Sequence, residues 1–374
     1  MGGFRLGSVL GFEIRIDYSW FIIFFLILWT FSFGVFPAVL PDLDAAVYFA
    51  MGLTGTLLFF ASLLAHELSH SVVARRRDIP VEGITLFVFG GMAHTRMEAE
   101  SPGDEFVIAG VGPLASLGIA VLFGAIGILA GAAGWPLPIA VVAQYLAFVN
   151  LALAVFNLLP GFPLDGGRLF RAAAWKYTGS LRKATRWASN GGKVLGYVLI
   201  ALGLLQFFGG ALLGGLWFVF IGWFVRTVAQ AGFRQHVLRE SLEGVKVKDL
   251  MAPEPVAVPG DTNLDEFVQQ FIMDGRHRAY PVVGDQGVTG LVTLDRVRKA
   301  PRDEWSQRTV ADIMKPRDDV EVASPDQPMT EILDRFGGAE GGRILVIQDG
   351  ELLGIITRSD LSRWIERSEM LESS

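Results

Sequence analysis

Two histidines and a glutamate lie inside a segment that is otherwise apolar enough to cross a membrane. The segment runs from Leu53 to Val73 and contains His66-Glu67-Leu68-Ser69-His70. An ionisable side chain at membrane depth costs about 2.5–3.5 kcal/mol on insertion scales, so it is rarely kept there without a function. Histidines four residues apart share one helix face, where both imidazoles reach one metal ion. Glu67 is then placed to take a proton from a water held by that ion.

Two histidines leave a catalytic metal site incomplete, because catalytic zinc usually has three protein ligands and one open position. The chain has no cysteine, so the third ligand is an Asp, a Glu or another His. His94 is one candidate, and Asp165 is the better one because it follows a Pro- and Gly-rich break at the same expected depth. Asn157 precedes this break and is expected to hold a substrate carbonyl or a developing oxyanion. Asn150 forms either a hydrogen bond between helices or part of the cavity.

The composition indicates a membrane domain followed by a soluble one. Of the 374 residues 51% are hydrophobic, the mean hydropathy is +0.43, and the long uncharged runs all fall within residues 17–232. The character changes near Gly244, so we expect a membrane domain over residues 1–235, a linker over 236–244 and a soluble domain over 245–374. Residues 1–20 are expected to form a short amphipathic lead-in. A net charge of −6 without a basic aromatic patch gives no sign of a nucleic-acid partner.

Six apolar runs are long enough to cross a hydrocarbon core of about 30 Å as helices. The loops on one side contain no Lys or Arg, whereas the other side holds Arg75–Arg77 and a second basic cluster between Arg168 and Arg186. The positive-inside rule predicts a multi-pass cell membrane protein with both termini and the soluble domain in the cytoplasm. The expected spans are roughly Tyr18–Leu40, Ala46–Ala74, Glu105–Ala133, Pro138–Leu159, Gly191–Phe208 and Ala211–Ala231.

One apolar segment is too short to span the bilayer. Residues 81–91 are rich in β-branched and aromatic side chains and end at Gly90-Gly91. They are expected to form a strand or hairpin that dips into the membrane. A strand edge is not stable in lipid, so this one must line a protein cavity. There it could accept an extended substrate by strand addition.

The soluble domain contains two copies of one pattern with a period of about 63 residues. The copies start at Val245 and Arg308, and each continues through a short strand, an apolar helix, a β-hairpin and a closing helix. The hairpins are expected over residues 279–293 and 343–357. We therefore predict an α/β module of two units, residues 245–300 and 308–366.

Taken together, these motifs resemble the site-2 protease family of intramembrane zinc metalloproteases. The resemblance rests on His66-Glu67-x-x-His70 in an early span and on Asn157-x-x-Pro-x-x-x-x-Asp165-Gly at the end of a later one, and it covers residues 1 to about 235. It implies that His66, His70 and Asp165 bind one zinc ion and that Glu67 is the general base. It also implies that Asn157, Gly90 and Gly91 position the substrate.

The repeated domain resembles the tandem CBS pair that one subgroup of this family carries. Such pairs often bind adenosine nucleotides through a Thr followed three residues later by an Asp, a pattern met by Thr357 and Asp360. The first repeat has Thr293 but places Arg296 at the matching position. Nucleotide binding is one expectation for the pair. The other is a structural pair that forms a homodimer contact or gates the active site.

The family resemblance implies that the substrate is a transmembrane protein, for example a membrane-anchored transcription regulator or an anti-sigma factor. Two other functions stay open at this point: a CBS-gated metal carrier and an inactive membrane receptor. A carrier needs ionisable groups through both halves of the membrane, whereas here they gather on one side. The presence of Glu67 disfavours the receptor.

Overall fold

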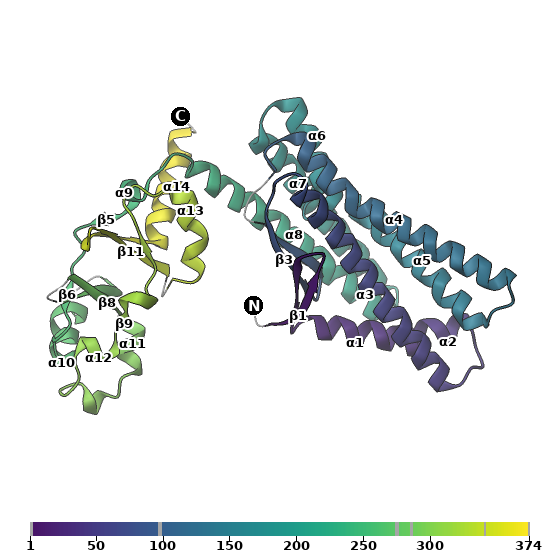
Figure 1. The fold of residues 1–374 in the computed structure, drawn as a ribbon, viewed down its shortest axis with the longest axis horizontal. Coiled ribbons are helices and arrows are strands. Elements are labelled where there is room, and N and C mark those ends of the chain that lie inside the picture. The colour runs from purple at the N-terminus through teal and green to yellow at the C-terminus, as the bar shows by residue number, and fades with distance from the viewer. Residues whose placement is uncertain (1–2, 96–98, 274–276, 285–286, 340–341, 373–374) are drawn as a thin grey trace. The chain divides into compact units, whose positions relative to one another are not determined.

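The structure is a computed structural model that describes residues 3–95, 99–273, 277–284, 287–339 and 342–372 (Figure 1). The chain divides into two compact units, Met1–Arg234 and Gln235–Ser374, here called the membrane unit and the C-terminal unit. Each is described by itself.

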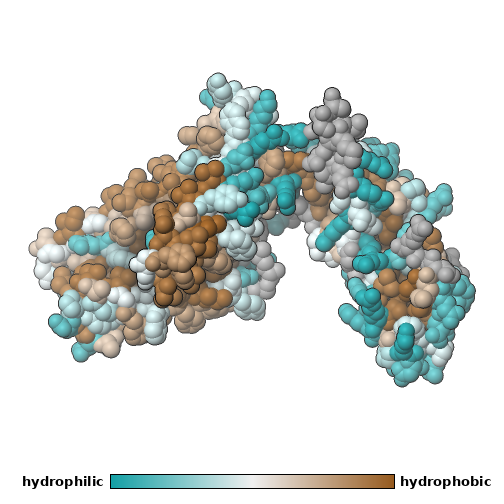
Figure 2. Space-filling view, turned by 180° about the vertical axis from the view of Figure 1, so that it is seen from behind, coloured by the Kyte–Doolittle hydropathy of each residue, from teal (hydrophilic) through white to brown (hydrophobic). Residues whose placement is uncertain are grey.

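Six helices of the membrane unit are long and apolar enough to cross a bilayer. Many of their large apolar side chains point outward, among them Val121, Ile128 and Leu205 at 66–71% exposure. Figure 2 shows such apolar side chains in brown over much of the visible face of this unit. The six spans are α1 with its π-helical turn and α2 (Trp20–Val39), α3 (Ala45–Arg75), α4 (Pro102–Ala132), α5 (Leu137–Asn157), α7 (Leu181–Phe208) and α8 (Leu212–Ser241).

The prediction of six spans is confirmed, and two of the helices are longer than expected. Helix α7 begins at Leu181 rather than near Gly191, because the basic residues before the apolar run continue the same helix. Helix α8 continues to Ser241 and so occupies most of the segment predicted to be a linker. An extra amphipathic helix, α6 (Asp165–Thr178), replaces part of the expected basic loop and ends at Gly179 with φ +66°.

Helices α7 and α8 approach each other through paired glycines. A Cβ atom on Gly196 would lie 2.7 Å from the carbonyl oxygen of Gly222, and one on Gly203 would lie 2.7 Å from that of Gly215. In each helix the two glycines lie on one face, because residues seven apart are two turns apart. Small residues allow this close backbone contact between membrane helices.

A four-stranded sheet completes the membrane unit. Its order is β1 (Gly3–Val9), β2 (Phe12–Asp17), β3 (Val81–Phe87) and β4 (Gly90–Thr95), with β2 and β3 parallel and the other neighbours antiparallel. The hairpin expected over residues 81–91 is present, and β4 is an edge strand.

The amphipathic lead-in expected over residues 1–20 consists largely of two strands, β1 and β2, which the sequence analysis did not predict. Phe12, Ile14 and Ile16 alternate with polar residues and are at most 5% exposed. Leu10 and Gly11 between the strands both have positive φ, as a tight hairpin turn requires. The alternation was visible in the sequence, but its partner strand β3 lies far along the chain.

The C-terminal unit is built from two similar four-stranded sheets, ordered β6-β7-β8-β9 and β10-β11-β12-β5. The hairpins β7–β8 (Ala279–Gly284, Gly287–Thr293) and β11–β12 (Arg343–Gln348, Glu351–Thr357) confirm the predicted repeat. Each sheet takes its last short strand from the start of the other repeat. The short strands are β5 (Ala252–Pro253), β6 (Val258–Pro259), β9 (Lys315–Pro316) and β10 (Val322–Ala323).

The two repeats share a buried core and are not independent units. Leu291 of β8 and Leu345 of β11 are fully buried in one apolar cluster. The strand exchange and this cluster make the pair a single module. Its helices are α9 (Val247–Leu250), α10 (Leu264–Phe267) with a π-helical continuation, α11 (Leu294–Lys299), α12 (Val310–Ile313), α13 (Met329–Ile332) and α14 (Arg358–Glu372).

Candidate metal centre and the pocket of the C-terminal unit

Three of the predicted site residues meet in the interior of the membrane unit. His66 and His70 lie one turn apart on α3, and Asp165 is the first residue of α6. The Asp165 Oδ2 atom lies 3.1 Å from His66 Nε2 and 3.3 Å from His70 Nε2, and the two Nε2 atoms are 3.2 Å apart. All three side chains are buried.

The other ring nitrogen of each histidine is held by α4. His70 Nδ1 lies 2.6 Å from the carbonyl oxygen of Ile108, and His66 Nδ1 lies 2.9 Å from Ser116 Oγ. A carbonyl oxygen only accepts, so His70 Nδ1 carries the proton and Nε2 keeps its lone pair. No pattern in the sequence pointed to Ser116 or to the Ile108 carbonyl, since neither belongs to a motif.

The donor set fits a zinc ion. Two ring nitrogens and a carboxylate oxygen converge in a buried site, where a cation bound among their lone pairs would offset the cost of burying the carboxylate charge. Zinc binds such N and O donors at about 2.0–2.2 Å, which in a tetrahedral site sets donors about 3.3 Å apart. The three separations of 3.1, 3.2 and 3.3 Å agree with that spacing.

Two glycines leave the room that this cluster needs. A Cβ atom on Gly112 of α4 would lie 2.1 Å from His70 Nε2 and 2.8 Å from His66 Nε2. A Cβ atom on Gly91 of β4 would lie 2.4 Å from Glu67 Cγ and 3.1 Å from its Oε1. The Glu67 side chain therefore lies directly against the edge strand. Gly91 was expected at the site, whereas Gly112 was not singled out.

The remaining candidates of the membrane unit lie outside the cluster or beyond what the structure describes. Asn157 ends α5, and its Nδ2 donates to the Leu153 carbonyl of the same helix. Asn150 Nδ2 donates to the Leu146 carbonyl of its own helix at 2.9 Å and, at 3.4 Å, to Ser62 Oγ on α3, so it contributes a long hydrogen bond between helices. Gly90 opens β4 with φ +135° and faces open space. The side chain of His94 lies outside the described residues.

In the second repeat, the carboxylate of Asp360 serves as a helix cap. Its Oδ2 accepts from the Thr357 N–H at 2.8 Å and from the Thr357 hydroxyl at 2.7 Å, and its Oδ1 pairs with Arg363. Asp360 is 8% exposed. Thr357 and Asp360 are thus close together, as the motif predicts, with the carboxylate directed to the start of α14.

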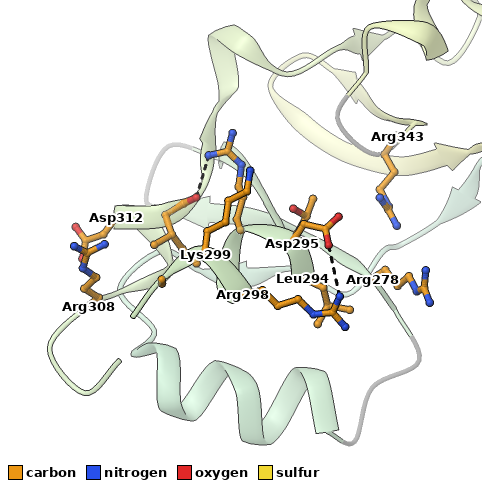
Figure 3. A pocket seen from close by; sticks show the side chains of 12 residues that line it. Arg278, Leu294, Asp295, Arg298, Lys299, Arg308, Asp312 and Arg343 are labelled. Carbon is orange, nitrogen blue, oxygen red and sulfur yellow. Dashed lines mark hydrogen bonds and ion pairs between the residues drawn. The ribbon is translucent and has the colours of Figure 1, made fainter. Parts of the chain in front are cut away.

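A pocket of about 870 Å³ lies in the first repeat, at the start of α11 (Figure 3). Buried Thr293 lines it, and Arg343 of the second repeat reaches it. Hydrogen bonds from the Thr309 backbone and hydroxyl hold the pKa of Asp312, one of two acidic side chains in the lining, below its usual range. The pocket lining holds two acidic side chains, Asp295 and Asp312, and six basic ones. The basic side chains are Arg278, Arg296, Arg298, Lys299, Arg308 and Arg343.

Arg296 is the residue at which the first repeat departs from the Thr-x-x-Asp pattern. Its Nη1 donates to the carbonyl oxygen of Ile313 at 3.2 Å, so the guanidinium is fixed at the wall of the pocket. Where the second repeat has a capping carboxylate, the first therefore has a fixed cation.

Comparison with known proteins agrees with both halves of this description. The model of peptidase family M50 matches residues 54–134 and 124–202, and the CBS domain model matches residues 247–303 and 310–367. The chain is 40% identical over 363 residues to the "Putative zinc metalloprotease Rip3" of Mycobacterium tuberculosis, covering 96% of this chain and 92% of that protein. It is 32% identical over 319 residues to the zinc metalloprotease MJ0392 of Methanocaldococcus jannaschii, covering 84% and 86%.

A solved structure, the site-2 protease from Methanocaldococcus jannaschii, is 28% identical to this chain and aligns with 62% of it and 94% of its own length at a TM-score of 0.42. The family predicted from the motifs is confirmed by the family models and the nearly full-length relatives. The chain therefore belongs to peptidase family M50, the site-2 protease family of membrane zinc metalloproteases, among the members that carry a C-terminal pair of CBS domains.

Proposed function

We propose that this protein is an intramembrane endopeptidase that cleaves transmembrane segments of membrane-anchored proteins. The observation that carries the proposal is the buried convergence of His66, His70 and Asp165 within a bundle of apolar helices. We assign these three residues as the zinc ligands and Glu67 as the general base. Substrates of this class include membrane-anchored transcription regulators and anti-sigma factors.

Each side chain has a separate role in the cleavage. A zinc ion held by His66, His70 and Asp165 would supply Lewis acidity toward the scissile carbonyl and would lower the pKa of water, so that hydroxide is available as the nucleophile. The Glu67 carboxylate takes a proton from the attacking water and returns it to the leaving nitrogen. The Nδ1 contacts to Ser116 and Ile108 keep both imidazoles turned toward the ion and fix the His70 tautomer.

The substrate is proposed to bind as an extended segment along β4. The outer position of β4 in the sheet and its contact with Glu67 at Gly91 support this, because a paired strand would pass beside the base. A helical peptide bond is shielded from attack, so the substrate helix must unwind locally first. Gly90 faces open space that a second backbone could enter, and Gly91 lets the Glu67 side chain lie against the strand. Asn157 is proposed to contact the substrate carbonyl.

We further propose that the cluster lies near the cytoplasmic face, with both termini and the CBS pair in the cytoplasm. Arg75 ends the helix that carries His70 and is followed by Arg76 and Arg77, and Asp165 begins the basic helix α6. Cytoplasmic loops carry such an excess of Arg and Lys. Proteolysis would then release a cytoplasmic fragment of the substrate.

The CBS pair is proposed to bind an adenosine nucleotide and thereby to regulate the protease. The cationic pocket of the first repeat supports an anionic ligand, because its six basic side chains outnumber its two acids. Thr293 is the motif residue that lines this pocket. Equilibrium dialysis of the full chain with ATP and AMP tests this. We expect millimolar or tighter binding that weakens in Lys299→Glu, and no binding by the wild type at millimolar nucleotide would exclude the ligand.

The proteolytic function is tested with purified wild type, Glu67→Gln and Asp165→Ala, each measured for zinc content and for cleavage of membrane-spanning peptides. We expect the wild type to bind one zinc ion and to cleave. Glu67→Gln should keep the ion and lose cleavage, while Asp165→Ala should lose both. Cleavage that survives in Glu67→Gln would contradict the assigned base. Zinc bound by a wild type that cleaves no membrane peptide would favour the carrier or the receptor.

A further inference from the structure

Two adjacent acids in the first turn of α4 pair with arginines from two different elements. Asp104 forms an ion pair with Arg77, which follows α3, and Glu105 forms one with Arg171 on α6. Helix α3 carries His66 and His70, and α6 begins at Asp165. One turn of α4 is thus tied to both elements that supply the proposed zinc ligands.

The two ion pairs differ in their environment. The side chains of Arg77 and Asp104 are 42% and 27% exposed, whereas those of Arg171 and Glu105 are 12% and 1% exposed. Arg171 Nε donates to Glu105 Oε1 at 2.6 Å. Within the described part of the chain, Glu105 Oε2 is buried without a hydrogen-bond partner. A buried and incompletely satisfied ion pair is poor evidence for stability, because desolvation opposes the Coulombic attraction.

The Glu105–Arg171 ion pair lies beside the groups that hold two of the proposed zinc ligands, His70 and Asp165. Glu105 lies one turn before Ile108, whose carbonyl oxygen accepts from His70 Nδ1. Arg171 also places its guanidinium 5.0 Å from the centre of the Phe162 ring, in the loop that leads into Asp165. Arg171 therefore contacts α4 and the approach to Asp165 at the same time.

We propose that Glu105 and Arg171 are positioning residues of the metal centre. Their ion pair sets the start of α6, and hence the Asp165 carboxylate, against the turn of α4 that orients His70. Neither residue touches the ion or the substrate. The planar guanidinium suits this task, because it donates to a carboxylate and stacks on an aromatic ring at once, which a lysine cannot do.

The inference rests on the proposed ligand set of His66, His70 and Asp165. Its test separates an effect on the position of these ligands from an effect on the stability of the fold. The full chain is purified in detergent as Arg171→Lys, Arg171→Met and the double variant Glu105→Met with Arg171→Met. Asp104→Asn is the matched control, since it removes the exposed ion pair in the same turn. Three quantities are measured: zinc affinity by chelator competition, the visible absorption spectrum of the cobalt(II)-substituted protein, and the thermal unfolding temperature.

We expect Arg171→Lys to fold and to bind zinc about 10-fold to 100-fold more weakly, the range seen when partners of metal ligands are lost. Its cobalt spectrum should differ from that of the wild type, because the Asp165 oxygen is displaced. In cleavage assays kcat should fall while KM stays close to the wild-type value. Asp104→Asn should match the wild type in zinc affinity and in the cobalt spectrum.

The double variant distinguishes a role in positioning the zinc ligands from a role in stabilising the fold. Removing both charges leaves neither member of this pair buried without its partner, so the unfolding temperature of the double variant should recover toward that of the wild type, whereas its zinc affinity should stay low. Wild-type zinc affinity and cobalt spectrum in Arg171→Lys would overturn the inference even if Arg171→Met fails to fold. Recovery of zinc affinity together with stability in the double variant would also overturn it. A wild type that binds no zinc would refute the ligand assignment itself.

Discussion

Replacing Gly112 by alanine should empty the metal centre while leaving the fold intact. The added Cβ would lie 2.1 Å from His70 Nε2, 2.4 Å from His70 Cε1 and 2.8 Å from His66 Nε2. Ordinary contact for a carbon atom begins near 3.4 Å. The His70 ring must therefore retreat by about 1.3 Å, the difference between 3.4 and 2.1 Å, to accept an alanine.

That displacement is too large for metal binding. Ligand distances in a metal site tolerate only about 0.2 Å of deviation. The ring cannot turn aside easily, because its Nδ1 is held by the Ile108 carbonyl at 2.6 Å and its surroundings are buried. We expect the zinc affinity of Gly112→Ala to fall by at least about 100-fold, at the upper end of what loss of an orienting partner produces.

The assay is chelator competition for zinc on the purified variant, together with its thermal unfolding temperature. Gly118→Ala is the matched control on the same helix, because a Cβ there meets nothing within 4 Å. That control should bind zinc like the wild type, because the added methyl group contacts no other residue. Its helix should be no less stable, since alanine is favoured over glycine inside a helix by about 0.5–1 kcal/mol. Wild-type zinc affinity in Gly112→Ala would refute the reasoning, because α4 would then not approach the two imidazoles this closely.

Four further changes test other parts of the structure. Glu67→Gln should slow peptide cleavage by about 10²–10⁴-fold, the usual contribution of a general base, at unchanged zinc content. Ser116→Ala should weaken zinc binding by about 10-fold to 100-fold in chelator competition, because His66 loses the partner of its Nδ1. Gly203→Leu should lower the thermal unfolding temperature by forcing α7 and α8 apart, whereas Gly232→Leu on α8, where a Cβ meets nothing within 4 Å, should not. A zinc chelator should abolish cleavage, and added zinc but not magnesium should restore it, since imidazole donors disfavour magnesium.

The parts of the fold that could be predicted from the sequence are those that depend on patterns among neighbouring residues. Six apolar runs of sufficient length predicted the spans, and a period of about 63 residues predicted the C-terminal repeat. Strands β1 and β2 were missed because a short alternating segment is a reliable sign of a strand only when its pairing partner is known, and here the partner β3 lies far along the chain. The exchange of β5 and β9 between the sheets was missed for the same reason, since strands of two residues leave no pattern.

In the candidate site, too, the residues in local motifs could be predicted, whereas the contacts between distant segments could not. His66 and His70 were found because their spacing is helical, and Glu67 because it adjoins the first of them. Asp165 was preferred over His94 because it follows a Pro- and Gly-rich break at the depth expected of the two histidines. The contacts that shape the cluster had no such signal. His66 meets Ser116 across 50 residues and Asp165 across 99, and His70 meets Ile108 across 38.

By itself, the sequence determined that this is a membrane protein with a metal-binding motif in a span, because hydrophobic length and helical periodicity are properties of neighbouring residues. Only the tertiary structure decided which ring nitrogen of each histidine faces the cluster and why residue 112 must be glycine. It also decided that Glu105 and Arg171 meet beside the donors. These features arise where α3, α4 and α6 pack together, and packing of distant segments is set by the shape of the whole bundle.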